Sequence, residues 1–170
     1  QWTRARARLS DARTLDPGQP EYADETGRLY LARALQLPPG ETLARDYARQ
    51  GLDYHRQAVR LRPGASQSWA SIALLKAHLP ETDAEFEAAL RNAALLGPWE
   101  PGVQLAVVDA GLAQWARLSP AARAAVRDTT ARALRWQDAE IFALARRAGR
   151  LDVVCALSEA ARSPLATACP

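Results

Sequence analysis

The sequence lacks several of the residues that chemistry most often needs. Its 170 residues include no methionine, two histidines, two cysteines and a single lysine, Lys76. Neither histidine lies in a metal-binding motif such as HExxH, so we expect no metal and no other cofactor. No run of about eighteen apolar residues could span a membrane, and no signal peptide is present. Because methionine is absent and the chain begins at Gln1, we expect a soluble piece of a longer protein.

The charge balance gives little support to a nucleic-acid partner. The net charge is +3 and the isoelectric point is near 9.2. The arginines, however, alternate with Asp and Glu along most of the chain, whereas a nucleic-acid binder usually gathers its charge on one face. With 48% hydrophobic residues, the chain can bury a substantial core as one domain or as a short repeat array.

Motifs for catalysis are also missing. No Ser, Cys or Lys stands in a recognisable nucleophile motif, and no glycine-rich loop could hold a phosphate. His55 and His78 lie in expected helices, where a single histidine near tyrosine is more often structural than catalytic. We therefore expect that the protein is not an enzyme.

What the sequence does contain is a repeated pattern of helices and turns. The clearest part is 58–76, where one helix ends before Pro63, Ser66 is placed to cap the next, and Trp69 and Ile72 share a face of it with Ala73. Thr82 with Glu85 reads as a capping box, and Ser119 with Pro120 as another helix start. The expected helices are 2–14, 20–35, 41–61, 66–78, 83–96, 102–117, 120–134, 137–148 and 151–161.

These helices resemble tetratricopeptide (TPR) repeats over about residues 2–116. Pro17, Pro63 and Pro98 follow helices at the family's position, and Gly27 with Tyr30 matches its glycine and tyrosine spacing. Ala23 and Thr26, however, replace the family's tryptophan and leucine. The resemblance implies an all-α fold in which antiparallel helix pairs stack into a right-handed superhelix, with degenerate helices at the C-terminal end.

The spacing of the prolines divides the chain into repeats of one TPR-like domain. Pro63 and Pro98 are about one family period apart, roughly 34 residues, whereas Pro17 and Pro63 are about a dozen residues farther apart. The second unit should therefore contain an insertion, in its double-proline loop and lengthened helix, that projects beyond the stack. The units are the second helix of a truncated repeat at 1–17, a repeat with an insertion at 20–63, a regular repeat at 66–98, degenerate helices at 101–161 and a tail at 162–170.

Stacked repeats of this type present a concave groove formed by the first helix of each pair. The resemblance implies an interaction scaffold, so we expect residues in this groove to contact a protein partner, a peptide or a partner helix. The expected groove residues are Asp24, Arg28, Gln67, Ala70, Leu74, Gln104 and Asp109.

The two cysteines allow two interpretations. In an oxidising compartment Cys155 and Cys169 would form a disulfide that attaches the tail to the last helix, with Ser163 and Pro164 turning the chain back. This is the interpretation we favour, because an even cysteine count that includes a chain terminus fits it. The alternative is two reduced thiols, with Cys155 buried and Cys169 on a frayed end.

Exposed aromatic and basic residues could indicate other ligands. The five tryptophans, Trp2, Trp69, Trp99, Trp115 and Trp136, could stack on sugars or bases, but they are scattered over several elements and we expect most to pack inside. Arg146 and Arg147 are expected to form a solvated helix end, where cations complement the helix dipole.

A narrower resemblance concerns the N-terminal stretch WTRARARLSDARTLDPGQPEYADETGRLYLARAL. It is similar to the opening of membrane-anchored bacterial proteins of the VpsP type, which are associated with exopolysaccharide biosynthesis. That resemblance implies a periplasmic accessory scaffold, anchored by an upstream helix, with a bridged cysteine pair. The alternatives are a cytoplasmic TPR adaptor that binds peptide tails, and a helical solenoid that binds polysaccharide or nucleic acid.

Overall fold

The computed structural model describes residues 1–38, 40–161 and 169, with the side chains of 159–161 excepted. Its described residues form α-helices joined by short turns, and they include no β-strand. The helices are α1 (Trp2–Leu15), α2 (Pro20–Leu35), α3 (Thr42–Leu61), α4 (Ser66–His78), α5 (Ala84–Leu96), α6 (Pro101–Ala113), α7 (Pro120–Ala133), α8 (Asp138–Ala148) and α9 (Leu151–Ala161), with a short 3₁₀ helix, η1 (Trp115–Arg117). The expected all-α fold is therefore confirmed.

Prolines and local caps set many of the helix ends. Pro20, Pro101 and Pro120 begin their helices, where the missing N–H costs nothing. The Ser119 hydroxyl accepts a hydrogen bond from Ala122 N, which confirms the expected cap. The predicted 102–117 helix is wrong at its end, because α6 stops at Ala113 and η1 follows as a separate turn.

Two other predicted caps are wrong. Ala65, rather than Ser66, occupies the cap position of α4, and the Ser66 hydroxyl donates instead to Glu100 Oε1 at 2.7 Å. The α5 helix is capped by Asp83, whose Oδ1 accepts from Phe86 N at 3.0 Å, and not by Thr82. At α5 the carboxylate of Asp83 is a stronger hydrogen-bond acceptor than the hydroxyl of the neighbouring Thr82.

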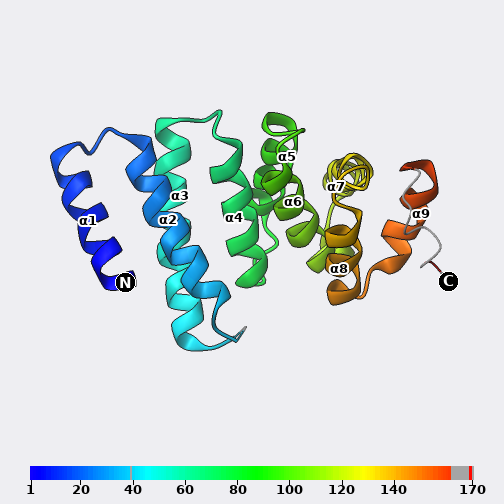
Figure 1. Ribbon diagram of the computed structural model, residues 1–170, viewed down its shortest axis with the longest axis horizontal. Helices are drawn as coiled ribbons and strands as arrows, with labels where there is room; N and C mark the ends of the chain where they lie inside the picture. The colour runs from blue at the N-terminus through cyan, green and yellow to red at the C-terminus, as the bar shows by residue number, and fades with distance from the viewer. Residues whose placement is uncertain (39, 162–168, 170) are drawn as a thin grey trace.

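The helices lie in a row of hairpins between the two ends of the chain (Figure 1). Helices α2, α4, α6 and α8 contact one another in sequence order, and α5, α7 and α9 do the same. Within each hairpin the two helices also contact each other. These pairs are α2 with α3, α4 with α5, α6 with α7 and α8 with α9. The alternate helices α2, α4, α6 and α8 therefore share one side of the molecule.

The α2–α3 hairpin is longer than the others. Its helices have 16 and 20 residues, whereas α4, α5 and α6 have 13 each. The end of this hairpin extends past the end of α4 (Figure 1), where the insertion was predicted. Pro39, which follows α2 and precedes α3 in the sequence, lies outside the described residues.

Two hydrophobic clusters form the core of the described part of the chain. The larger one joins α2 to α7 and includes Ile72, Phe86 and Leu90, and the smaller one joins α6 to α9 and includes Ile141 and Phe142. The close approach of α6 and α7 depends on Gly111, because a Cβ at this position would lie 2.9 Å from Val126 Cγ1. The core holds the alternate helices at fixed spacing, which positions the residues on their shared side.

Candidate functional site: the inner groove

A continuous groove runs over the shared side of α2, α4, α6 and α8. Each of these helices contributes residues three or four positions apart, which is the spacing of one helix face. We call this surface the inner groove. The residues lining it are Arg28, Leu31, Ala32, Leu35, Leu37, Gln67, Ala70, Ser71, Leu74, Ala77, His78, Gly102, Leu105, Ala106, Asp109, Ala110, Ala113, Glu140, Ala143, Leu144 and Arg147.

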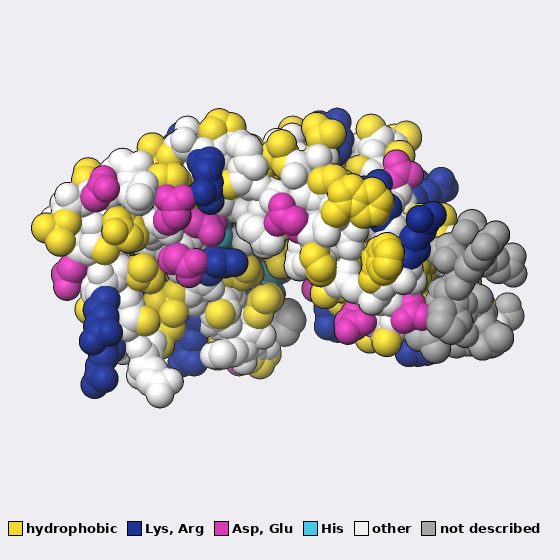
Figure 2. All heavy atoms as spheres, turned by 45° about the horizontal axis from the view of Figure 1, so that its top comes forward, with side chains coloured by type: hydrophobic (Ala, Val, Ile, Leu, Met, Phe, Trp, Pro, Cys, Tyr) yellow, Lys and Arg dark blue, Asp and Glu magenta, His cyan; other side chains and the backbone are white. Residues whose placement is uncertain are grey.

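The groove consists of three adjoining cavities of about 540, 370 and 340 Å³. Leu74 of α4 lines all three cavities, so they form one surface. The space-filling view shows the molecule hollowed between the projecting end of the α2–α3 hairpin and α8 (Figure 2). Leu35, at the rim, is 52% exposed although it is a large aliphatic side chain.

Five of the seven predicted groove residues line this surface. They are Arg28, Gln67, Ala70, Leu74 and Asp109. The prediction is wrong for Asp24 and Gln104, because both side chains are buried among the helices. Gln104 donates from Nε2 to Pro98 O at 2.8 Å and accepts from Gln137 Nε2 at 2.9 Å, so it holds two turns together instead of facing a partner.

Asp24 belongs to a buried polar cluster with His55 and Ser68. Its Oδ1 accepts from Ser68 Oγ at 2.5 Å and from His55 Nδ1 at 3.1 Å. Burial raises the pKa of Asp24, but these hydrogen bonds and the nearby Arg28 outweigh it, and the net pKa lies below its usual value. The ionised carboxylate thus links α2, α3 and α4. Gly27 makes room for His55, since a Cβ there would lie 2.7 Å from the imidazole.

Charged and polar groups border the leucines and alanines of the groove. Arg147 of α8 donates from Nη2 to Asp109 Oδ1 of α6 at 2.7 Å, and Arg28 donates to Glu25 Oε1 at 2.7 Å. His78 lies at one end, where burial lowers its pKa and favours the neutral imidazole. Arg147 was missed as a groove residue, although its spacing of three from Leu144 was a usable signal.

A second charged cluster lies outside the groove. The Lys76 side chain is only 1% exposed, and its Nζ lies 2.8 Å from Asp83 Oδ2 and 2.9 Å from Glu85 Oε2. Arg56 of α3 donates to the same carboxylate, from Nε to Oε1 at 2.7 Å and from Nη2 to Oε2 at 2.6 Å. The hydrogen bonds from Arg56 and Lys76 lower the pKa of Glu85 to about 2. This cluster joins α3, α4 and α5.

The described residues offer no arrangement for metal binding. Among them, no group of three or more His, Cys, Asp or Glu side chains could hold a metal ion. His55 and His78 lie in separate environments, and the Nε2 of each is buried without a hydrogen-bond partner in the described part of the chain. Nor is any helix among the described residues long and apolar enough to cross a bilayer.

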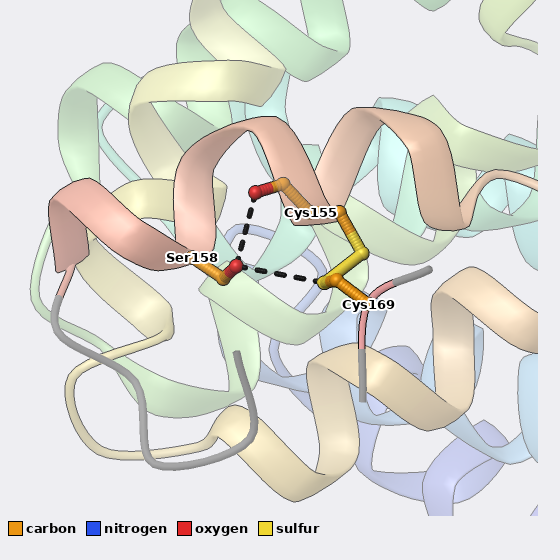
Figure 3. The surroundings of a disulfide bond; sticks show 3 residues. All are labelled: Cys155, Ser158 and Cys169. Carbon is orange, nitrogen blue, oxygen red and sulfur yellow. Dashed lines mark hydrogen bonds between the residues drawn. A yellow bond between two sulfur atoms is a disulfide. The ribbon is translucent and has the colours of Figure 1, made fainter. Parts of the chain in front are cut away.

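The predicted disulfide is present in the structure. Cys155 of α9 and Cys169 are joined, with their Cα atoms 5.6 Å apart, and Ser158 Oγ lies 3.7 Å from Cys169 Sγ (Figure 3). The same hydroxyl donates to Cys155 O at 3.0 Å. The expected turn at Ser163 and Pro164 lies outside the described residues, as does the rest of the tail apart from Cys169.

Three of the five tryptophans are half-buried, as expected, and two are not. Trp2 packs edge-on against Tyr30 and Tyr47, Trp69 donates to Pro63 O at 2.7 Å, and Trp115 packs against the core. Trp99 and Trp136 are largely exposed, so the expectation of inward packing is wrong for them. Both lie in turns, where a side chain has few neighbours to pack against.

Comparisons with known proteins identify no relative of this chain. No protein-family model, curated protein or solved structure matches this chain.

Proposed function

We propose that the protein is a non-catalytic scaffold for protein–protein interaction, with the inner groove as its binding surface. The observation that carries this proposal is the continuity of the groove over four alternate helices. Leu35, Leu74, Leu105 and Leu144 give it an aliphatic floor or rim, one residue from each helix. Contiguous exposed apolar surface of this kind, bordered by charged groups, is typical of an interaction site.

The occupant that fits is an amphipathic helix or an extended peptide with aliphatic side chains. A partner helix presents apolar residues at the spacing i, i+3, i+4 and i+7, which matches a groove formed by parallel rows of leucine and alanine. Arg28 at one end and the Arg147–Asp109 pair at the other can orient such a segment through polar contacts. A partner with an apolar stripe flanked by charges would therefore bind here.

The proposed architecture behind this groove is a TPR-like right-handed superhelix of antiparallel pairs. Its support is the TPR resemblance of the sequence, together with the contacts between successive hairpins and between α2, α4, α6 and α8. In this arrangement α1 is the second helix of a truncated repeat, and it packs against α2 through Trp2 and Tyr30.

We further propose that the scaffold works in the bacterial periplasm as an accessory protein of exopolysaccharide biosynthesis or export. The disulfide supports an oxidising compartment. The resemblance of the N-terminal stretch to VpsP-type proteins supports the pathway and an upstream membrane anchor. Intact mass after non-reducing alkylation, on protein expressed with its native N-terminal region, tests the compartment. Two blocked cysteines support it, and two alkylated thiols in soluble protein favour a cytoplasmic adaptor.

The groove itself is tested with a photo-reactive amino acid at position 35, and with the same residue at position 61 as the control. Leu35 and Leu61 are 52% and 44% exposed, but only Leu35 lines the groove. We expect a discrete cross-linked product from position 35 alone. It should disappear when Leu144→Glu places a charge in the groove. Equal products from both positions would contradict the proposal.

A further inference from the structure

Two exposed indoles stand on neighbouring turns outside the inner groove. Trp99, in the α5–α6 turn, is 65% exposed, and Trp136, in the α7–α8 turn, is 74% exposed. Neither indole lines any of the cavities described above. Figure 2 shows large hydrophobic side chains beside Lys or Arg side chains over the half of the molecule formed by α5 to α8.

A chain of hydrogen bonds fixes these two turns beside each other. Gln137, which follows Trp136, donates to Gln104, and Gln104 donates to Pro98 O, next to Trp99. Because Gln104 is buried, this link is protected from water and well defined. The two rings are thus carried by a rigid part of the fold, although each is exposed to solvent.

Arg132 adds a cation to the same surface. Its Cζ lies 6.0 Å from the centre of the Trp99 ring. Arg132 is in the last turn of α7, and Trp136 follows in the turn after that helix. The Nη2 of Arg132 donates to Thr129 Oγ1 at 3.3 Å, which orients the guanidinium. The Nε of Arg132 is buried, so the donors left for an anionic ligand are those of Nη1 and the second N–H of Nη2.

We propose that Trp99, Arg132 and Trp136 form a binding site for an acidic polysaccharide. The C–H face of a pyranose ring carries partial positive charge and stacks on the negative face of an indole. A uronate carboxylate pairs with the guanidinium of Arg132. Because the surface is open and has two indoles, it suits successive sugars of a polymer better than an enclosed small molecule. The proposal concerns a different surface from the inner groove and does not rest on that groove's function.

The polar residues beside the two indoles favour a sugar over an apolar macromolecule as the ligand. Arg135, which precedes Trp136, is exposed, and its guanidinium can hydrogen-bond to sugar hydroxyls or pair with a carboxylate. The carboxylate of Glu100 and the Nε2 of Gln137, the other polar groups beside the indoles in sequence, are held by Ser66, Gln67 and Gln104. Leu95, at the end of α5, is 76% exposed and provides the matched control. A bilayer or an apolar protein surface would use Leu95 as well as the indoles, whereas a pyranose ring gains little from an aliphatic side chain.

The experiment measures binding of sodium alginate, a polyuronate, and of neutral dextran by titration calorimetry at 150 mM NaCl. We expect alginate to bind and Trp99→Ala and Trp136→Ala each to weaken it about tenfold or more, as for other exposed aromatic anchors. Leu95→Ala should change alginate affinity less than twofold. Arg132→Gln should weaken alginate more than dextran. Far-UV circular dichroism and melting temperature verify that each variant is folded.

Several results would overturn the proposal. One is absence of alginate binding at millimolar sugar. Another is binding that survives both tryptophan substitutions and disappears with added salt, which would indicate a polyanion effect alone. A third is binding to anionic phospholipid vesicles that requires Leu95 and both indoles while alginate does not bind. That outcome would assign the surface to a membrane instead.

Discussion

Substituting Gly111 with alanine tests the packing that sets the spacing of the groove helices. Gly111 lies in α6 against Val126 of α7, and both are buried. An added Cβ would lie 2.9 Å from Val126 Cγ1 and closer still to Cγ2. Val126 cannot turn away easily, because a β-branched side chain in a helix has one strongly preferred rotamer. The helices must therefore separate or a strained rotamer must form.

The magnitude follows from two opposing terms. Overpacking of a buried contact costs about 1–3 kcal/mol, and the severity of this overlap favours the upper end. Replacing glycine with alanine in a helix returns about 1 kcal/mol. The net expectation is a loss of about 2 kcal/mol, which corresponds to a fall in melting temperature of about 4–8 °C for a chain of this length.

A matched control lies in the same helix. A Cβ at Gly102 would meet nothing closer than Gln67 Nε2 at 3.8 Å, so Gly102→Ala should leave the melting temperature unchanged or raise it. Circular dichroism melts of the two variants make the comparison. In a double-mutant cycle, Gly111→Ala and Val126→Ala should also be coupled. Val126→Ala removes the methyl groups that a Cβ at position 111 overlaps, and that Cβ partly fills the cavity left by Val126→Ala. A Gly111→Ala protein as stable as the parent would refute the packing argument.

Three further predictions concern charge and the disulfide. Folding lowers the pKa of Glu85 from 4.5 to about 2, so the stability that its carboxylate contributes is present above pH 4.5 and is lost as the pH falls toward 2. Urea midpoints measured across this pH range should therefore fall less steeply for Glu85→Gln than for the parent protein. Lys76→Met leaves Glu81, Asp83 and Glu85 without their shared cation, and we expect the free energy of unfolding in urea to fall by about 1–2 kcal/mol. The control Arg49→Met, on the exposed side of α3, should change it little. A reductant should lower the melting temperature, because the bond closes a 14-residue separation and contributes up to about 3 kcal/mol in the chain-entropy model; a Cys155→Ala, Cys169→Ala double variant that remained sensitive to reductant would contradict this.

The helices were predictable because their signals are local. Pro20, Pro101 and Pro120 each sit at a helix start, and the expected boundaries differ from the observed ones mainly at 102–117. The predicted cap at Ser66 was wrong by one residue, because Ala65 has the extended backbone of the cap position and Ser66 is already helical. The cap of α5 is Asp83 and not the adjacent Thr82. The sequence pattern does not locate a helix start to within one residue.

The groove was predictable only in part, because local periodicity does not show contacts between residues far apart in the chain. Arg28, Gln67, Ala70, Leu74 and Asp109 follow from helix periodicity, which places the members of each helix on one face. Asp24 shares that periodicity, but His55 and Ser68 come from other helices and draw its carboxylate inward. Pairing of Arg147 with Asp109 joins residues far apart in the chain, which no local pattern indicates. Exposure of Trp99 and Trp136 likewise depends on how neighbouring turns meet.

The most direct test of the central claim is hydrogen exchange on the partner complex captured through position 35. If the inner groove is the binding surface, slowed exchange should be confined to α2, α4, α6 and α8, most strongly around Leu74, which lines all three cavities. Helices α3, α5 and α7 should exchange at the rates of the free protein. Protection concentrated on α3, α5 and α7, with the groove helices unchanged, would contradict the account.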